Sequence, residues 1–116
     1  MIKSTTLLIT LFTAIIASNA QNYQWAKRIG GSSSDNANSI TVDNSGNVYT
    51  TGSFRGTVDF DPGIATSNLT STGFREDIFI SKLDSAGNFQ WAKSIGGSFF
   101  DIGYSIAVDS YGNTYT

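Results

Sequence analysis

The stretch QWAKRIGGSSSDNANSITVDNSGNVYT, residues 24–50, decides the fold, because it returns as QWAKSIGGSFFDIGYSIAVDSYGNTYT in residues 90–116. Gln24 and Gln90 stand 66 residues apart, and the two copies align without a gap. A fixed period of this kind is typical of repeat architectures, in which one unit cannot bury its apolar face alone. We therefore expect units of 66 residues that stack on one another.

The rest of the pattern predicts short strands and no amphipathic helix. Apolar residues alternate with polar ones, β-branched and aromatic side chains are frequent, and Gly, Asn, Asp and Ser recur every few residues. The expected strands are 39–43, 47–52, 77–84, 88–95, 104–109 and 113–116, the last two repeating the first two.

Three segments of the form D-x-x-G-N separate these strands: 43–47, 84–88 and 109–113. In such a turn the Asp side chain accepts a backbone N–H, and Gly supplies the positive φ of a hairpin loop. Two of these turns fall in each repeat, which gives four antiparallel strands, the number in a propeller blade. We therefore predict an all-β fold of propeller blades, with an incomplete ring in this chain.

A meander of four strands also predicts where the connections lie. The D-x-x-G-N turns fall at one end of the blade. The long connection 53–76 and the segments between blades, 30–35 and 96–101, fall at the opposite end. Loops carry function more often than strands do, so we expect binding at that opposite end.

The first twenty residues have the pattern of a secretory signal peptide. Lys3 precedes an apolar run over 7–17, and Ser18-Asn19-Ala20 supplies the small residues of a cleavage site. A membrane anchor is the alternative, but the run is shorter than the roughly 20 residues that a bilayer span needs. We expect cleavage before Gln21, a secreted or cell-surface protein, and no transmembrane segment in the mature chain.

The remaining chain divides by the repeat into an outer strand without partners (21–31), one full blade (32–97) and the start of the next blade (98–116). The strand expected over 22–29 matches 88–95, and it would complete the last blade of a closed ring. The second copy stops at Thr116, where the first copy continues. We therefore expect a fragment whose remaining blades are encoded downstream.

The composition excludes several classes of function. The net charge is −2, and removal of Lys3 with the signal peptide makes it −3, so no basic patch is available for nucleic acid. The absence of Cys removes disulfides. The absence of His removes the commonest general base and metal ligand, so an enzyme would have to use carboxylates, Tyr, Lys or Arg.

DIFISKLDSAGNFQWAKSIGG over 77–97, followed by D-x-G-Y-S-I-A-V-D-x-x-G-N over 101–113, resembles the SBBP β-propeller repeat. This family is found largely in secreted or surface proteins of bacteria. The resemblance covers residues 21–116, and it implies a propeller and an exported location. It implies no reaction and no catalytic residue.

Arg55 and Arg75, near the two ends of the long connection, are candidates for binding an anionic or sugar ligand. The alternative is a solvated cluster with the neighbouring acids. Phe99 and Phe100 are further candidates, because the first copy has serines at the same places. These two rings are therefore not needed by the repeat itself, and the alternative to a binding feature of one blade is that they simply cover a loop.

Asp59 and Asp61 begin a D-x-D-x-G segment, which resembles the opening of some calcium loops. Calcium needs six to eight oxygen ligands, and no third acid follows closely. The alternative is a Pro-Gly turn with two Asp caps. Calcium is the one cofactor that the sequence suggests, and no other is expected.

Trp25 and Trp91, with Tyr23 and Phe89 two residues earlier, recur at the same place in each copy. We expect each pair to share one strand face and to pack between blades rather than to stack on sugars.

These observations predict a non-catalytic propeller scaffold that presents loops to a protein or a polysaccharide. The alternative is a fragment of a carbohydrate-active propeller enzyme, a hydrolase or lyase that works with carboxylates and tyrosines. Further near-identical units downstream would favour the scaffold.

Overall fold

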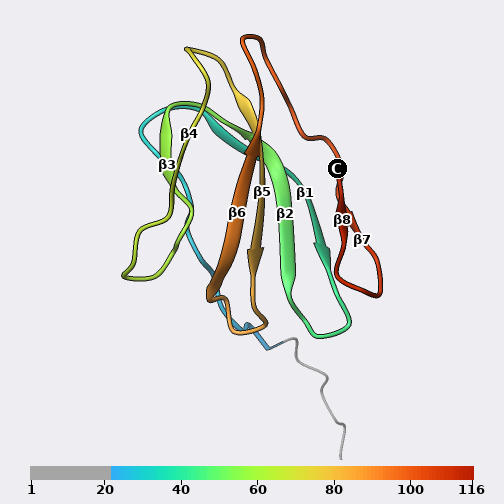
Figure 1. The fold of residues 1–116 in the computed structure, drawn as a ribbon. Coiled ribbons are helices and arrows are strands. Elements are labelled where there is room, and N and C mark those ends of the chain that lie inside the picture. Colours follow the sequence, from blue (N-terminus) through green and yellow to red (C-terminus); the bar gives the residue numbers. More distant parts are fainter. Residues whose placement is uncertain (1–21) are drawn as a thin grey trace, which may run out of the picture.

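A computed structural model describes residues 22–116, and the expected signal peptide lies outside these residues. Its centre is an antiparallel sheet with the strand order β1 (Asp35–Val42), β2 (Val48–Phe54), β5 (Asp77–Leu83) and β6 (Phe89–Ile95). Two small hairpins flank the sheet, namely β3 (Thr57–Asp59) with β4 (Asn68–Thr70), and β7 (Ala107–Val108) with β8 (Thr114–Tyr115). Figure 1 shows these hairpins on opposite sides of the sheet.

The sheet confirms the predicted all-β blade of four antiparallel strands. Strand β1 starts four residues earlier than expected, because Asn36 and Ala37 already pair with the end of β2. A bulge at Asn38 interrupts this ladder, and the Asn38 amide donates to the carbonyl oxygen of Gly103 at 2.9 Å. Within the described residues 22–116, no helix is long and apolar enough to cross a membrane.

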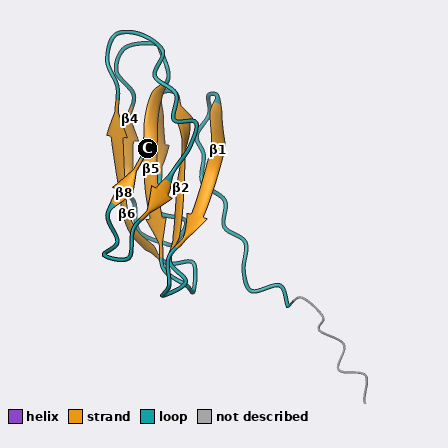
Figure 2. Cartoon of the chain, turned by 90° about the vertical axis from the view of Figure 1, so that its right-hand side faces the viewer, coloured by secondary structure: helices purple, strands orange, loops and turns teal. Residues whose placement is uncertain are grey.

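The tight turns have the conformation that the D-x-x-G-N pattern predicts. Gly46, Gly87 and Gly112 have φ values of 80°, 81° and 84°. In the first turn the Oδ1 atom of Asp43 accepts the backbone N–H groups of Ser45 and Asn47, both at 2.9 Å. Figures 1 and 2 show the tight turns together at one end of the sheet. The loop between β3 and β4 reaches back towards this end, beside Gly87 (Figure 1).

One face of the sheet is covered by the β3–β4 hairpin. Phe54 and Phe79 from the sheet pack against Val58 and Phe60 from the hairpin, and all four side chains are buried. Phe54 and Phe60 meet edge to face, with ring centroids 5.4 Å apart. The expectation that the connection 53–76 lies only at the loop end is therefore wrong. Its middle turns back along the sheet because its apolar residues complete the core.

The opposite face packs against the start of the second copy. Tyr49 and Ile80 form a cluster with Ile106, and Trp91 and Val108 pack against it. Ile106 is only 7% exposed. Ile40 occupies the same place in the first copy, on the other face of the blade, and is 66% exposed. The second copy thus shows how one blade stacks on the next.

Phe89 and Trp91 do not share one face, and that expectation is wrong. Lys82 pairs with Trp91 and Leu83 with Phe89, so Gln90 forms a bulge that reverses the alternation. Phe89 consequently joins the cluster under the β3–β4 hairpin, whereas Trp91 packs edge to face on Tyr49 with ring centroids 6.2 Å apart. The predicted packing between blades holds for Trp91, which lies against the cluster with Ile106, whereas Phe89 packs within its own blade.

The segment 22–29 lies beside the blade but forms no strand, in contrast to the expected outer strand. Within residues 22–116 no neighbouring strand pairs with it. Its Trp25 indole N–H donates to the carbonyl oxygen of Ser85 at 2.9 Å. Trp25, Lys27 and Ile29 line one side of a cleft of about 270 Å³ whose other side includes Ile40 and Val48. Side-chain anchoring on the blade therefore replaces ladder hydrogen bonds in this segment.

Candidate functional site

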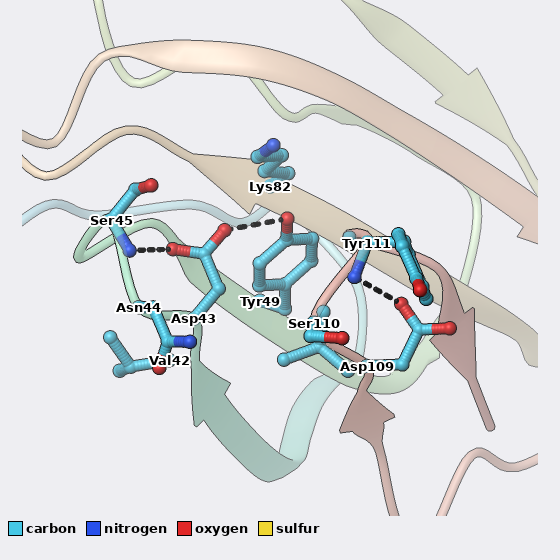
Figure 3. Close-up of a pocket in the computed structure, with 11 residues that line it drawn as sticks. Val42, Asp43, Asn44, Ser45, Tyr49, Lys82, Asp109, Ser110 and Tyr111 are labelled. Atoms are coloured by element: carbon cyan, nitrogen blue, oxygen red, sulfur yellow. Dashed lines mark hydrogen bonds between the residues drawn. The ribbon is translucent and has the colours of Figure 1, made fainter.

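The tight-turn end holds a cleft of about 310 Å³ between the first turn of each copy. Asp43 and Ser45 line it from the first copy, and Asp109 and Tyr111 line it from the second (Figure 3). The ammonium group of Lys82 lies 5.0 Å from the centre of the Tyr49 ring. This cleft combines two carboxylates, a cation and hydroxyl groups, so it is the first place to look for chemistry.

The carboxylates in this cleft accept a full set of hydrogen bonds from groups in and next to their own turns. Besides the two N–H groups on Oδ1, the Oδ2 atom of Asp43 accepts the amide of Asn47 at 2.8 Å and the hydroxyl of Tyr49 at 3.0 Å. A carboxylate has about four acceptor positions, and all four are taken. Asp109 has the same set of donors in the second copy, from Tyr111, Asn113 and Tyr115.

These hydrogen bonds also favour the ionised form of the aspartate in each turn. The bond from the Asn47 side chain, with others from the turn and from Tyr49, lowers the pKa of Asp43 to about 2. Corresponding bonds lower the pKa of Asp84 and of Asp109. The bond to Asp109 raises the pKa of Tyr115. A carboxylate with a lowered pKa is a poor general acid at neutral pH, so the arrangement is that of a structural turn.

The loop end brings together two of the residues singled out in the sequence. The guanidinium carbon of Arg75 lies 4.4 Å from the centre of the Phe100 ring. Directly beside this pair, the backbone N–H of Asp101 donates to the carbonyl oxygen of Glu76 at 2.9 Å. The end of the long connection and the segment between blades are thus joined by both a cation–π contact and a hydrogen bond.

Each of the two loops is shaped by an aspartate. The Oδ2 atom of Asp77 accepts the backbone N–H of Thr72 at 2.9 Å, and Gly73 has a φ of 68°. The Oδ2 atom of Asp101 accepts the N–H of Gly97 at 2.8 Å. In the first copy, Asp35 accepts the N–H of Gly31 in the same way. The same turn therefore carries phenylalanines in one copy and serines in the other.

Three aromatic rings at this end are open to solvent. Phe74 is 86% exposed, Phe99 79% and Phe100 56%. Sequence reasoning missed Phe74, although a large apolar residue between Gly73 and Arg75 in a loop was a signal that could have identified it. We name Phe74, Arg75, Phe99 and Phe100 the loop-end patch.

Arg55 lies at the same end but beside the first copy. Its backbone N–H donates to the carbonyl oxygen of Ser34 at 3.1 Å, and its side chain is exposed. The structure therefore places Arg55 against the serine-bearing segment and Arg75 against the phenylalanine-bearing one.

Asp59 and Asp61 act as turn acceptors. The Oδ1 atom of Asp59 accepts the backbone N–H groups of Asp61 and Ser67, at 3.0 and 2.8 Å. The Oδ1 atom of Asp61 accepts the N–H of Gly63 at 2.7 Å. Among residues 22–116, no group of three acidic side chains is arranged to hold a metal ion. These contacts favour the Pro-Gly turn with Asp caps over the calcium loop.

The four-stranded blade, its tight turns and its contact with the second copy define a propeller-repeat protein. Residues 24–53 match the model of the SBBP family, described as a beta-propeller repeat, which confirms the resemblance noted in the sequence. The chain therefore carries an SBBP repeat within an all-β fold of propeller type.

One curated relative is an uncharacterized WD repeat-containing protein of Acanthamoeba polyphaga mimivirus, 33% identical over 103 residues. The match covers 77% of this chain, and the chain spans about 7% of the length of that relative. No solved structure matches the chain. Because WD repeats form propeller blades, this relative agrees with a propeller scaffold.

Proposed function

We propose that the chain is part of a secreted or surface scaffold without catalytic activity, which presents the loops of one blade end to a protein or a polysaccharide. The observation that carries this proposal is the difference between the two copies. The same Gly-Gly turn displays Ser33 and Ser34 in the first copy and Phe99 and Phe100 in the second. Large rings that are exposed in one copy alone indicate a binding role, because the repeat architecture does not require them.

The carboxylates support a scaffold over the alternative of a carbohydrate-active enzyme. Glycoside cleavage by the usual route needs a pair of carboxyl groups, one of which has a raised pKa. The carboxylates that face the cleft between the two tight turns accept a full set of hydrogen bonds, and their pKa values are lowered. An enzyme would therefore need its acid and base elsewhere.

Export is tested by the N-terminus of the mature protein. We expect secreted material to begin at Gln21, with or without cyclisation to pyroglutamate. Mass spectrometry of protein from the culture medium measures this directly. Membrane-bound protein that retains residues 1–20 would contradict export by signal cleavage.

The binding role and the enzyme role are separated by one pair of measurements on the same samples. The chain is incubated with a panel of neutral and acidic polysaccharides, and both retention and release of reducing ends are measured. Retention without product release supports the scaffold. Product release that disappears on replacing a carboxylate would support the enzyme instead.

A further inference from the structure

We propose that the loop-end patch binds a protein segment that presents a carboxylate between apolar side chains. This inference rests on the proposed function and names the class of partner. The patch offers three phenylalanine rings and one guanidinium group on two loops that are joined to each other. Aromatic residues and arginine are the side chains most enriched in the centres of protein interfaces.

The patch is held in place before any partner arrives. Arg75 is stacked on Phe100, and the bond from the Asp101 N–H to the Glu76 carbonyl oxygen closes the two loops beside that pair. A side chain that is already ordered loses less conformational entropy on binding. Preorganisation of this kind is what a recognition surface needs.

The guanidinium group of Arg75 remains available to an anion. Among residues 22–116 its N–H groups make no hydrogen bond or ion pair with another side chain. Within this part of the chain, neither Asp101 nor Glu76 forms an ion pair with it, since the Oδ2 atom of Asp101 accepts the N–H of Gly97 and the buried Oε2 atom of Glu76 has no hydrogen-bond partner. Arginine pairs with a carboxylate through two parallel hydrogen bonds, so a carboxylate is the group that completes this site.

The balance of apolar and polar groups favours a protein over a polysaccharide. Besides Arg75, the exposed residues with polar side chains in segments 72–75 and 98–100 are Thr72 and Ser98, next to three phenylalanines. A sugar chain presents many hydroxyl groups that need hydrogen-bond partners when they lose water. Apolar side chains of a peptide have no such requirement, and they match the exposed rings.

The charge of the chain also disfavours an anionic membrane as the partner. Aromatic residues with an adjacent cation can enter a lipid surface, but polybasic segments are what attract anionic leaflets. The chain has nine acidic residues against seven basic ones. The single guanidinium group of the loop-end patch therefore suits a single carboxylate better than a charged surface.

The test uses a library of random 12-residue peptides displayed on phage, selected against the full chain. Enriched peptides are synthesised, and their affinities are measured by fluorescence anisotropy. We expect enriched peptides to carry Asp or Glu next to apolar residues. We expect Arg75→Gln to weaken their binding at least about tenfold, because a charged hydrogen bond is lost.

Phe99→Ser with Phe100→Ser is the second variant, and it restores the residues that the first copy carries on the same turn. Its fold should persist, as checked by circular dichroism, while peptide binding is lost. Arg28→Gln and Tyr111→Ser are the matched controls. Both residues are exposed and lie outside the two loops, Tyr111 in a tight turn at the opposite end. Neither control should change the affinity.

Peptides without an acidic residue, or binding that survives Arg75→Gln, would overturn the inference. Retention of a polysaccharide or of phosphatidylserine vesicles at the patch, with no peptide enriched, would also overturn it. Polysaccharide retention in that case would leave the proposed function standing. If the protein is folded but binds neither peptides nor polysaccharides, both this inference and the proposed function would be wrong.

Discussion

Replacing Ile106 by Ala should destabilise the protein far more than the same replacement of Ile40. The two residues are equivalent by the repeat, and Ile40 lies in β1 whereas Ile106 directly precedes β7. Ile106 is 7% exposed and packs on Tyr49 and Ile80, whereas Ile40 is 66% exposed. The comparison therefore measures the contact between successive blades with the side chain and its local sequence position held constant.

The structure sets the size of the expected difference. Truncation of a buried Ile to Ala costs about 2–5 kcal/mol, because apolar contact is lost and a cavity remains. An exposed site usually changes stability by less than about 0.5 kcal/mol. For a domain of this size, about 1 kcal/mol corresponds to roughly 4–8 °C in Tm. Ile106→Ala should lower the Tm by at least about 8 °C, and Ile40→Ala should leave it nearly unchanged.

Two measurements check this prediction. Thermal unfolding followed by circular dichroism gives the Tm of each variant over a range of protein concentrations. Amide hydrogen exchange at Ala107 and Val108 shows whether the β7–β8 hairpin separates from the blade before the blade unfolds. In Ile106→Ala these two amides should exchange faster than in the parent chain.

Equal losses of stability in the two variants would refute the stacking argument. The argument would also be refuted if Ile106→Ala changed neither the Tm nor the amide hydrogen exchange of the β7–β8 hairpin. In either case the second copy would not be packed on Tyr49, and the structure would give no basis for stacking blades.

Three further predictions concern the turns, the charges and the open face. Gly46→Val and Gly87→Val should each cost more than about 1 kcal/mol in urea unfolding, because both glycines have positive φ. Gly87→Val should cost more than Gly46→Val, since an added Cβ at Gly87 would lie 2.9 Å from the Trp25 ring. Negligible costs would contradict the turn geometry, and equal costs would contradict the contact with Trp25. The lowered pKa of Asp43 means that its stabilisation is complete above the ordinary value of 3.8 and is lost as the pH falls towards about 2. The Tm should therefore fall in this acid range, and Asp43→Asn should flatten that dependence; an identical acid profile in the variant would count against it. Sedimentation velocity should show association that grows with concentration and is reduced by Ile40→Asp with Val42→Asp, because these two apolar side chains are exposed; a monomer at all concentrations would disprove this.

The sequence predicted the blade because its signals are local and repeated. Each D-x-x-G-N turn specifies its own hydrogen bonds, as Asp43 and Gly46 demonstrate. The alternation of apolar and polar residues then specifies the strands between turns. The features that the sequence pattern did not predict depend on contacts between residues far apart along the chain. The bulge at Gln90 and the return of Phe60 to the core depend on packing partners that no short pattern contains.

The candidate site was predicted only in part, for a similar reason. Comparison of the copies singled out Phe99 and Phe100, and the position in the long loop singled out Arg75. Their contact depends on how two loops meet, 25 residues apart along the chain, which the pattern does not encode. Asp59 and Asp61 matched the opening of a calcium loop, but their oxygens close local turns instead.

The near-identity of residues 23–29 and strand β6 has a consequence for how the chain folds. YQWAKRI and FQWAKSI differ only at Tyr23 against Phe89 and at Arg28 against Ser94. Both segments therefore satisfy the requirements of the position beside β5. During synthesis the N-terminal segment leaves the ribosome first, and it can compete for the edge of β5 before β6 exists. Exchange of equivalent elements is a characteristic error of repeat proteins. The anchoring of Trp25 on Ser85, away from the strand edge, keeps the two segments in separate places in the folded chain.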